Sequence, residues 1–276
     1  MIRFGPSGND ELFYEQGFKN TNQAPEWLHK MGLSALEINL GHGIRMSNET
    51  ARLIGEQAKK HNIEISAHAP YYVNLAKDES YHKNLGYVKR SLELLKEMGG
   101  RRLVVHAASQ GDYTRDVALE NTARNLKKLL SEIKDDFLIC IETMGNYSRI
   151  GNVQEVVELC RLDSRLVPCL DFGHINCLLQ GELSTNPDKI REILDYVEKE
   201  LGREKLNKLH IHWSAIVFGP KGERRHTTLG DSEWNFPFEP LAKYIKEKKL
   251  DNIVIISESD SIMAQDALRL SRIFFS

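Results

Sequence analysis

Short apolar runs recur along this chain of 276 residues, and six of them end on a residue type that binds metals. Runs of Val, Ile and Leu are typical of buried β-strands, and burial gives no reason for an acid or an imidazole at the final position. In a parallel β/α barrel the C-terminal ends of all strands open onto one face, where active sites lie. The pattern therefore predicts that these ends converge on one metal site: His68, His106, Glu142, Asp171, His210 and Glu258.

The chain between these runs favours a strict alternation of strand and helix. Residues 80–98, for example, place Leu85, Val88, Leu92 and Leu95 on one helical face. Eight strands and eight helices are expected, in a chain close to the ~250 residues of a (β/α)8 barrel. We predict an α/β fold, a single TIM-barrel domain over residues 1–276 with its active site at the C-terminal ends of the strands.

Two further features of the pattern bear on this fold. No GxGxxG motif follows the first expected strand, residues 2–5, which weighs against a dinucleotide-binding fold. The connection over residues 214–235 is expected to be a long loop, and long loops in compact domains tend to carry function.

Composition excludes several classes of protein. The formal net charge is −2, and 41% of the residues are hydrophobic and 28% charged, which does not favour a generally basic nucleic-acid binder. The four cysteines form no CxxC pair, so we expect reduced, buried thiols. No signal peptide and no apolar run of the ~18 residues needed to span a membrane is recognisable. We expect a cytoplasmic protein.

The expected strand ends offer oxygen and nitrogen ligands. Glu142, Asp171, His210 and Glu258 form a set suited to Zn²⁺, Mn²⁺ or Mg²⁺. A single carboxylate at a strand end is more often a helix cap or a surface residue, but four in register would repel one another without a cation. A lone strand histidine is likewise usually a core residue, although adjacent strand ends favour ligand roles for two of them, His68 and His106.

Loop residues extend this set. His174 follows Asp171 in an Asp-x-x-His pattern, and His226 lies in a charged segment that reads most simply as a surface loop. In a loop that faces the pocket, the same segment offers a further ligand and two arginines suited to phosphate oxygens, Arg224 and Arg225. Tyr71, Tyr72 and Asn74 follow His68. Aromatic residues in such a loop usually pack on the rim of the barrel, and in a functional reading they stack on a base or a sugar.

The number of candidate ligands exceeds what one ion needs. A surplus of histidines and carboxylates indicates two or three metals, the arrangement that clamps both oxygens of a phosphoryl displacement.

These residues resemble the endonuclease IV family of apurinic/apyrimidinic endonucleases, within the xylose-isomerase-like barrel superfamily. The resemblance runs from about the second strand onward, and the sequence of residues 218–226 is most similar to that of the archaeal-type branch. Its strongest segments are residues 66–75, 105–106, 141–145, 170–174 and 210–230. It implies a hydrolase that acts as a monomer and cuts DNA 5′ to abasic sites during repair, with two or three Zn²⁺ ions and Mn²⁺ as an alternative at one site.

The resemblance also implies residue roles. The first zinc would bind two histidines, and the second zinc would bind an acid, a histidine and another acid. Glu142 would bridge these two zinc ions. A further pair of histidines would bind the third zinc. In that order the residues are His68 and His106; Asp171, His210 and Glu258; and His174 and His226.

The chain departs from the family at two places. The family carries Asp where Arg224 stands, and Glu223 lies one position earlier. The family also carries Asn-Asp where this chain has His212 and Trp213.

Three functions compete at this stage. In a metal-dependent phosphodiesterase, Glu142 would bridge the metals and Glu258 would orient or deprotonate the attacking water. A sugar isomerase or epimerase of the same superfamily would need only one metal, with the same two carboxylates as acid and base. A non-catalytic DNA- or partner-binding barrel is the third reading, drawn from Arg224. The extra histidines favour the first.

Overall fold

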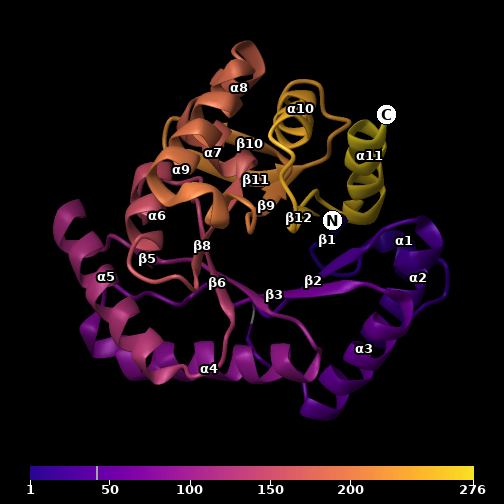
Figure 1. The fold of residues 1–276 in the computed structure, drawn as a ribbon, viewed down its shortest axis with the longest axis horizontal. Helices are drawn as coiled ribbons and strands as arrows, with labels where there is room; N and C mark the ends of the chain where they lie inside the picture. The colour runs from indigo at the N-terminus through magenta and orange to yellow at the C-terminus, as the bar shows by residue number, and fades with distance from the viewer. Residues whose placement is uncertain (42) are drawn as a thin grey trace.

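Eight parallel strands form the centre of the molecule. The computed structural model describes residues 1–41 and 43–276, and its main sheet has the order β1-β12-β9-β8-β6-β4-β3-β2. The sheet curls into a nearly closed barrel with helices on its outside (Figure 1). Its strands are β1 Ile2–Pro6, β2 Ala35–Asn39, β3 Glu64–His68, β4 Arg102–Val105, β6 Leu138–Glu142, β8 Leu166–Asp171, β9 His210–Trp213 and β12 Ile253–Ser257.

Helices connect these strands and pack around the barrel. The helices are α1 Glu11–Glu15, α2 Ala24–Met31, α3 Asn48–His61, α4 Tyr81–Glu97, α5 Arg115–Glu132, α6 Val153–Cys160, α7 Phe172–Leu178, α8 Glu182–Thr185, α9 Asp188–Leu206, α10 Glu239–Glu247 and α11 Met263–Phe275. Side-chain caps start several of them: Ser47 accepts from Thr50 N, and Asn152 forms a capping box with Glu155. Among the described residues no helix is long and apolar enough to cross a membrane.

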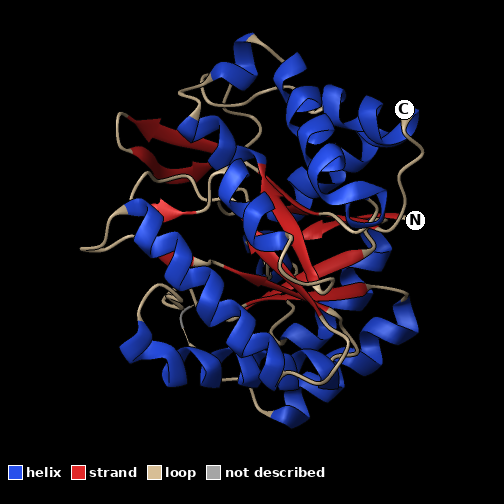
Figure 2. Cartoon of the chain, turned by 60° about the vertical axis from the view of Figure 1, so that its left-hand side comes forward, coloured by secondary structure: helices blue, strands red, loops and turns tan. Residues whose placement is uncertain are grey.

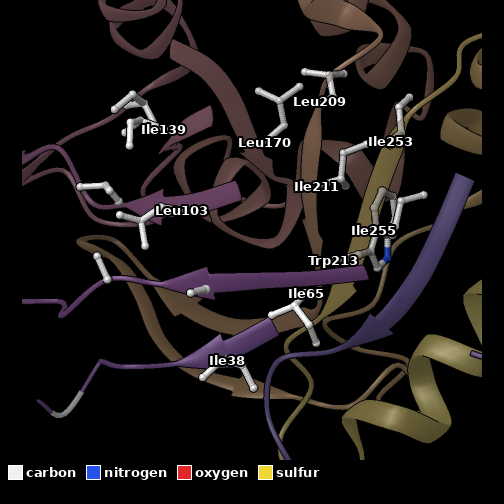
Figure 3. Packing of buried hydrophobic residues seen from close by; sticks show 14 of the residues in the cluster. Ile38, Ile65, Leu103, Ile139, Leu170, Leu209, Ile211, Trp213, Ile253 and Ile255 are labelled. Atoms are coloured by element: carbon white, nitrogen blue, oxygen red, sulfur yellow. The ribbon is translucent and has the colours of Figure 1, made fainter. Parts of the chain in front are cut away.

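The alternation of side chains along each strand separates two cores. Outward-facing residues such as Ile38, Ile65 and Leu103 pack against the helices in the largest apolar cluster (Figure 3). Inward-facing residues form small clusters of Val, Ala, Ile and Cys inside the barrel. Because side chains alternate with period two, Glu37 and Ser66 share the inward register with these clusters. The candidate ligands at the strand ends belong to the same register.

The barrel closes where β1 meets β2. A parallel bridge joins Ser7 to Glu37, and Ser34 N donates to Phe4 O at 2.9 Å. A Cβ atom at Gly5 would overlap the carbonyl oxygen of Ala35. Glycine at this position therefore lets the first two strands approach closely enough for closure.

The predicted alternation of strands and helices is confirmed, but the structure adds elements that the sequence did not predict, among them the short helix α1. Residues 214–235 are not a structureless loop, because they contain an antiparallel hairpin of β10 Ala215–Gly219 and β11 Gly222–Thr227 (Figure 2). The helix expected between Asp171 and about residue 201 is three helices, α7 to α9. Gly181, with φ of 90°, and Pro187 lie at their boundaries. A second, two-residue ladder pairs β5 Ala108–Ser109 with β7 Arg149–Ile150.

Candidate metal centre

The first ligand group lies at the ends of β3, β4 and β6. The Nε2 atoms of His68 and His106 lie 3.0 and 2.8 Å from Glu142 Oε2. The Nδ1 atom of His68 lies 2.8 Å from the carbonyl oxygen of Ala69, so Nδ1 carries the proton and Nε2 is left for a ligand. Two imidazole nitrogens and one carboxylate thus face a common point.

The second group shares Glu142 with the first. Its other oxygen, Oε1, lies 3.2 Å from His212 Nδ1, and the same nitrogen lies 3.4 Å from Glu258 Oε2 and 3.9 Å from Asp171 Oδ2. Asp171 Oδ1 caps helix α7 by accepting from His174 N at 2.7 Å. Asp171 Oδ2 is buried and has no hydrogen-bond partner among the described residues. His174 Nδ1 lies 3.2 Å from this oxygen without forming a hydrogen bond to it, and a buried carboxylate oxygen in that state, next to two further acids, is suited to a cation.

The third group comes from helix α7 and the hairpin. Glu223 Oε2 lies 3.2 Å from His174 Nε2, and Glu223 Oε1 lies 3.5 Å from His226 Nε2. Both histidines have their Nδ1 atoms within 2.9 Å of a backbone carbonyl oxygen, of Thr143 and Glu258 respectively. The Nε2 atoms therefore face the carboxylate, and the three side chains form a further potential metal site.

A β-bulge places Glu223 in this group. The hairpin register pairs Val217 with Arg225 and Phe218 with Glu223, so Arg224 is the extra residue on β11. Arg224 and Arg225 are exposed, and the Arg224 guanidinium lies against Gly219. The departure noted in the sequence therefore has a structural reason: the inserted Arg224 bulges outward, and Glu223 supplies the carboxylate.

The prediction for His210 needs correction. The β8–β9 register pairs Asp171 with His212 at the open end of the barrel, and Cys169 with His210 one inward step deeper. His210 Nε2 donates to Glu37 Oε2 at 2.9 Å, whereas His212 faces Glu142, Asp171 and Glu258. His212 takes the expected place of His210. The two share one face of β9, so only the register with β8 distinguishes them.

We therefore expect His212→Asn to weaken metal binding about 100-fold, because it removes a nitrogen from the group of three carboxylates. His210→Asn is the matched variant and should keep metal affinity within about threefold. Titration of the metal-free protein with Co²⁺, followed by its visible absorption, measures both. The reverse ranking would restore His210 as the ligand.

Mutual electrostatics explain how so many charges stay buried together. Burial opposes the charged form of both residues, but the contact with Glu142 raises the pKa of His68 to about 9, and the surrounding histidines hold the pKa of Glu142 well below its usual range. Burial raises the pKa of Asp171 to about 6. In the metal-free protein, protons thus balance charge that divalent ions would otherwise balance, so ions binding here would displace protons.

A cavity of about 460 Å³ opens above these groups. Tyr71 and Arg149 line it together with most residues of the three groups, although Asp171 and His212 do not. Tyr72, Arg224 and Arg225 do not line it, and Tyr72 contacts Tyr87 instead.

Asn74 is also absent from the lining, and its side chain organises a loop. Its Oδ1 atom accepts from Ala76 N and Ser109 N. Sequence pattern did not single out Glu37, Arg149 or His212. For His212, the inward period-two register of β9 was the available signal.

Comparison with known proteins identifies the family of this chain. A family model described as a xylose isomerase-like TIM barrel matches residues 25–272. The chain belongs to this family. A protein of Methanocaldococcus jannaschii named only as uncharacterised is 29% identical over 99% of this chain and 97% of its own length. A probable endonuclease 4 of Mycoplasma pneumoniae is 26% identical over 79% of this chain and 75% of its own length, which confirms the resemblance to endonuclease IV.

Solved structures share the fold. A D-tagatose 3-epimerase-like protein superposes with a TM-score of 0.73 at 21% identity, covering 99% of this chain and 96% of its own. At this identity the likeness shows the barrel and not the reaction.

Proposed function

We propose that this protein is a divalent-metal-dependent phosphodiesterase that hydrolyses DNA 5′ to abasic sites. The observation that carries the proposal is the third ligand group, His174, Glu223 and His226, beside two groups that share Glu142. A one-metal isomerase has no use for these three residues. Three neighbouring groups, two of which share a carboxylate, suit two or three ions. Zn²⁺ is the best match to this imidazole-rich set.

The residues divide the work of a phosphoryl displacement. Bound cations would supply Lewis-acid stabilisation of the phosphate oxygens. Glu142 offers one oxygen to each of two groups and so fixes their separation. Glu258 has the most exposed side chain of its group and lines the cavity, and in this proposal its carboxylate orients the attacking water and accepts its proton.

The cavity wall has a feature that suits an anionic substrate. Arg149 is the only lysine or arginine among the described residues that line it, and none of the described carboxylates forms an ion pair with it. Its Nη1 atom donates to Ser109 Oγ at 2.7 Å, which holds the guanidinium beside the ligand groups. A partly buried arginine with unused donors is suited to phosphate oxygens.

We expect Arg149→Gln to raise KM for abasic duplex about tenfold and to leave the metal content unchanged. The salt dependence of binding should also fall by about one unit of slope, as for the loss of one phosphate contact. Arg225→Gln, on the exposed face of the hairpin, is the comparison and should change KM by less than about twofold. Equal effects of the two variants would count against a phosphate contact at Arg149.

The proposal is tested by two measurements on the purified protein. Elemental analysis should find more than one divalent ion per chain. A duplex with one abasic analogue should be cut on its 5′ side, and neither an undamaged duplex nor a chelated sample should be cut. One ion per chain together with no cleavage would reject the proposal.

A sugar isomerase or epimerase is the second candidate. One group alone, Glu142, Asp171, His212 and Glu258, matches the ligand set such an enzyme needs, with two carboxylates for proton transfer. Conversion of a free ketohexose by the metal-loaded protein, with loss of deuterium from the exchanged carbon, would favour this function over hydrolysis.

The expected setting of the protein also belongs to the proposal. All four cysteines are free and buried, which suits a reducing compartment, and we propose that the protein acts as a monomer in the cytoplasm.

A further inference from the structure

A buried carboxylate lies beneath the metal centre, inside the barrel. Glu37 is on β2, is fully buried, and faces β9 across the interior. Its Oε2 atom accepts from His210 Nε2 at 2.9 Å and from Ser66 Oγ at 3.0 Å. Its Oε1 atom lies 3.1 Å from His212 Nε2. The strands β2, β3 and β9 thus meet at one carboxylate.

His212 connects this carboxylate to the metal centre. Its Nε2 atom faces Glu37, and its Nδ1 atom faces the oxygens of Glu142 and Glu258. The His212 Nε2 and Glu37 Oε1 atoms lie within ion-pair distance, and neither forms a hydrogen bond in the described part of the chain. Among the described acids, Glu37 is the one whose ion-pair contact with His212 is through Nε2.

The other histidines of the centre show what this contact does. In His68, His174 and His226 the Nδ1 atom lies 2.8 to 2.9 Å from a backbone carbonyl oxygen, which favours the tautomer with its proton on Nδ1. His212 lies in mid-barrel, where the strand carbonyls are engaged in the sheet. There a charged acceptor replaces the carbonyl, and a carboxylate fixes the proton on the far nitrogen more strongly than an amide oxygen does.

Burial of Glu37 has no evident structural reason. A carboxylate removed from water costs several kcal/mol unless it is well paired, and an apolar side chain in its place often stabilises a core as well or better. The neighbouring inward positions hold Ala35, Val254 and Ile256, which pack without charge.

We propose that Glu37 is a positioning residue, which holds His212 with its proton on Nε2 and so directs Nδ1 to a divalent ion at Glu142, Asp171 and Glu258. The proposal rests on the proposed metal centre. It holds for either reaction considered above, because it concerns the binding of the ion and not the substrate.

The test uses metal affinity and not activity. Metal-free wild type, Glu37→Gln and Glu155→Gln are titrated with Co²⁺, and binding is followed by visible absorption and calorimetry. Glu155 is a buried carboxylate paired with Arg115 outside the centre, so its variant controls for the loss of a buried charge. Glu37→Gln should bind the ion at this group about 10- to 100-fold more weakly, and Glu155→Gln should bind as wild type does.

A second measurement needs no variant. The ¹⁵N spectrum of the histidines in the zinc-loaded wild type should show His212 with a proton on Nε2 and metal on Nδ1. The opposite assignment overturns the proposal, and so does wild-type Co²⁺ affinity in Glu37→Gln. If the wild type itself binds no divalent ion, the proposed metal centre fails as well, which separates that outcome from a failure of Glu37 alone.

Discussion

Glu142→Gln is expected to lower kcat for cleavage of abasic DNA by about 10⁴-fold. Glu142 belongs to two of the three ligand groups, through different oxygens. The amide keeps the shape but removes the negative charge and one acceptor, so both groups lose a ligand. A loss of about 5 kcal/mol in transition-state stabilisation corresponds to that factor.

The control for this variant is Asp266→Asn. Asp266 is similarly buried, and its Oδ2 atom accepts a hydrogen bond from Leu229 N at 2.8 Å. It belongs to none of the three ligand groups. It should lose stability but retain kcat and metal content. Single-turnover rates and elemental analysis on all three proteins decide the matter, and a Glu142→Gln protein that cleaves at more than a tenth of the wild-type rate would exclude the bridging role.

Glu223→Gln is expected to remove one ion per chain and to lower kcat about 10³-fold. The variant leaves His174 and His226 without the carboxylate that lies between them. An ion held by two imidazoles and no acid loses charge balance as well as a ligand.

Arg224→Ala is the matched variant, one residue away on the same strand. Its side chain is exposed at the bulge, so metal content should stay at the wild-type value and kcat within about threefold. Metal analysis and cleavage rates measure both. If Arg224→Ala lost the ion and Glu223→Gln kept it, the assignment of the hairpin ligand would be reversed.

The fold was predictable because two signals agreed along the whole chain. Apolar runs such as residues 103–105 are too short for helices, and the segments between them have helical periodicity. Eight such units in a chain of this length leave few alternatives to a parallel barrel. The hairpin was missed because β11 has the sequence GERRHT, whose polar and charged residues carry no strand alternation.

The site was predictable where a ligand ends its strand, and less so elsewhere. His68 and Glu142 are the last residues of β3 and β6, so topology alone brings them together. His210 and His212 both face inward on β9, and their depth depends on the register with β8, which sequence pattern does not fix. Glu37 lies in the middle of β2, where neither a turn nor a strand end marks it.

Glu37 has a second property that joins the barrel seam to the centre. Its backbone makes the bridge to Ser7 that closes β2 onto β1, and its side chain lies against His212. Thermodynamic linkage then requires reciprocity: an ion that favours the aligned imidazole also favours the closed seam, and a seam that opens weakens the ion's hold by the same factor. Amide protons of β1 and β2 should accordingly exchange with solvent more slowly once the ions are bound.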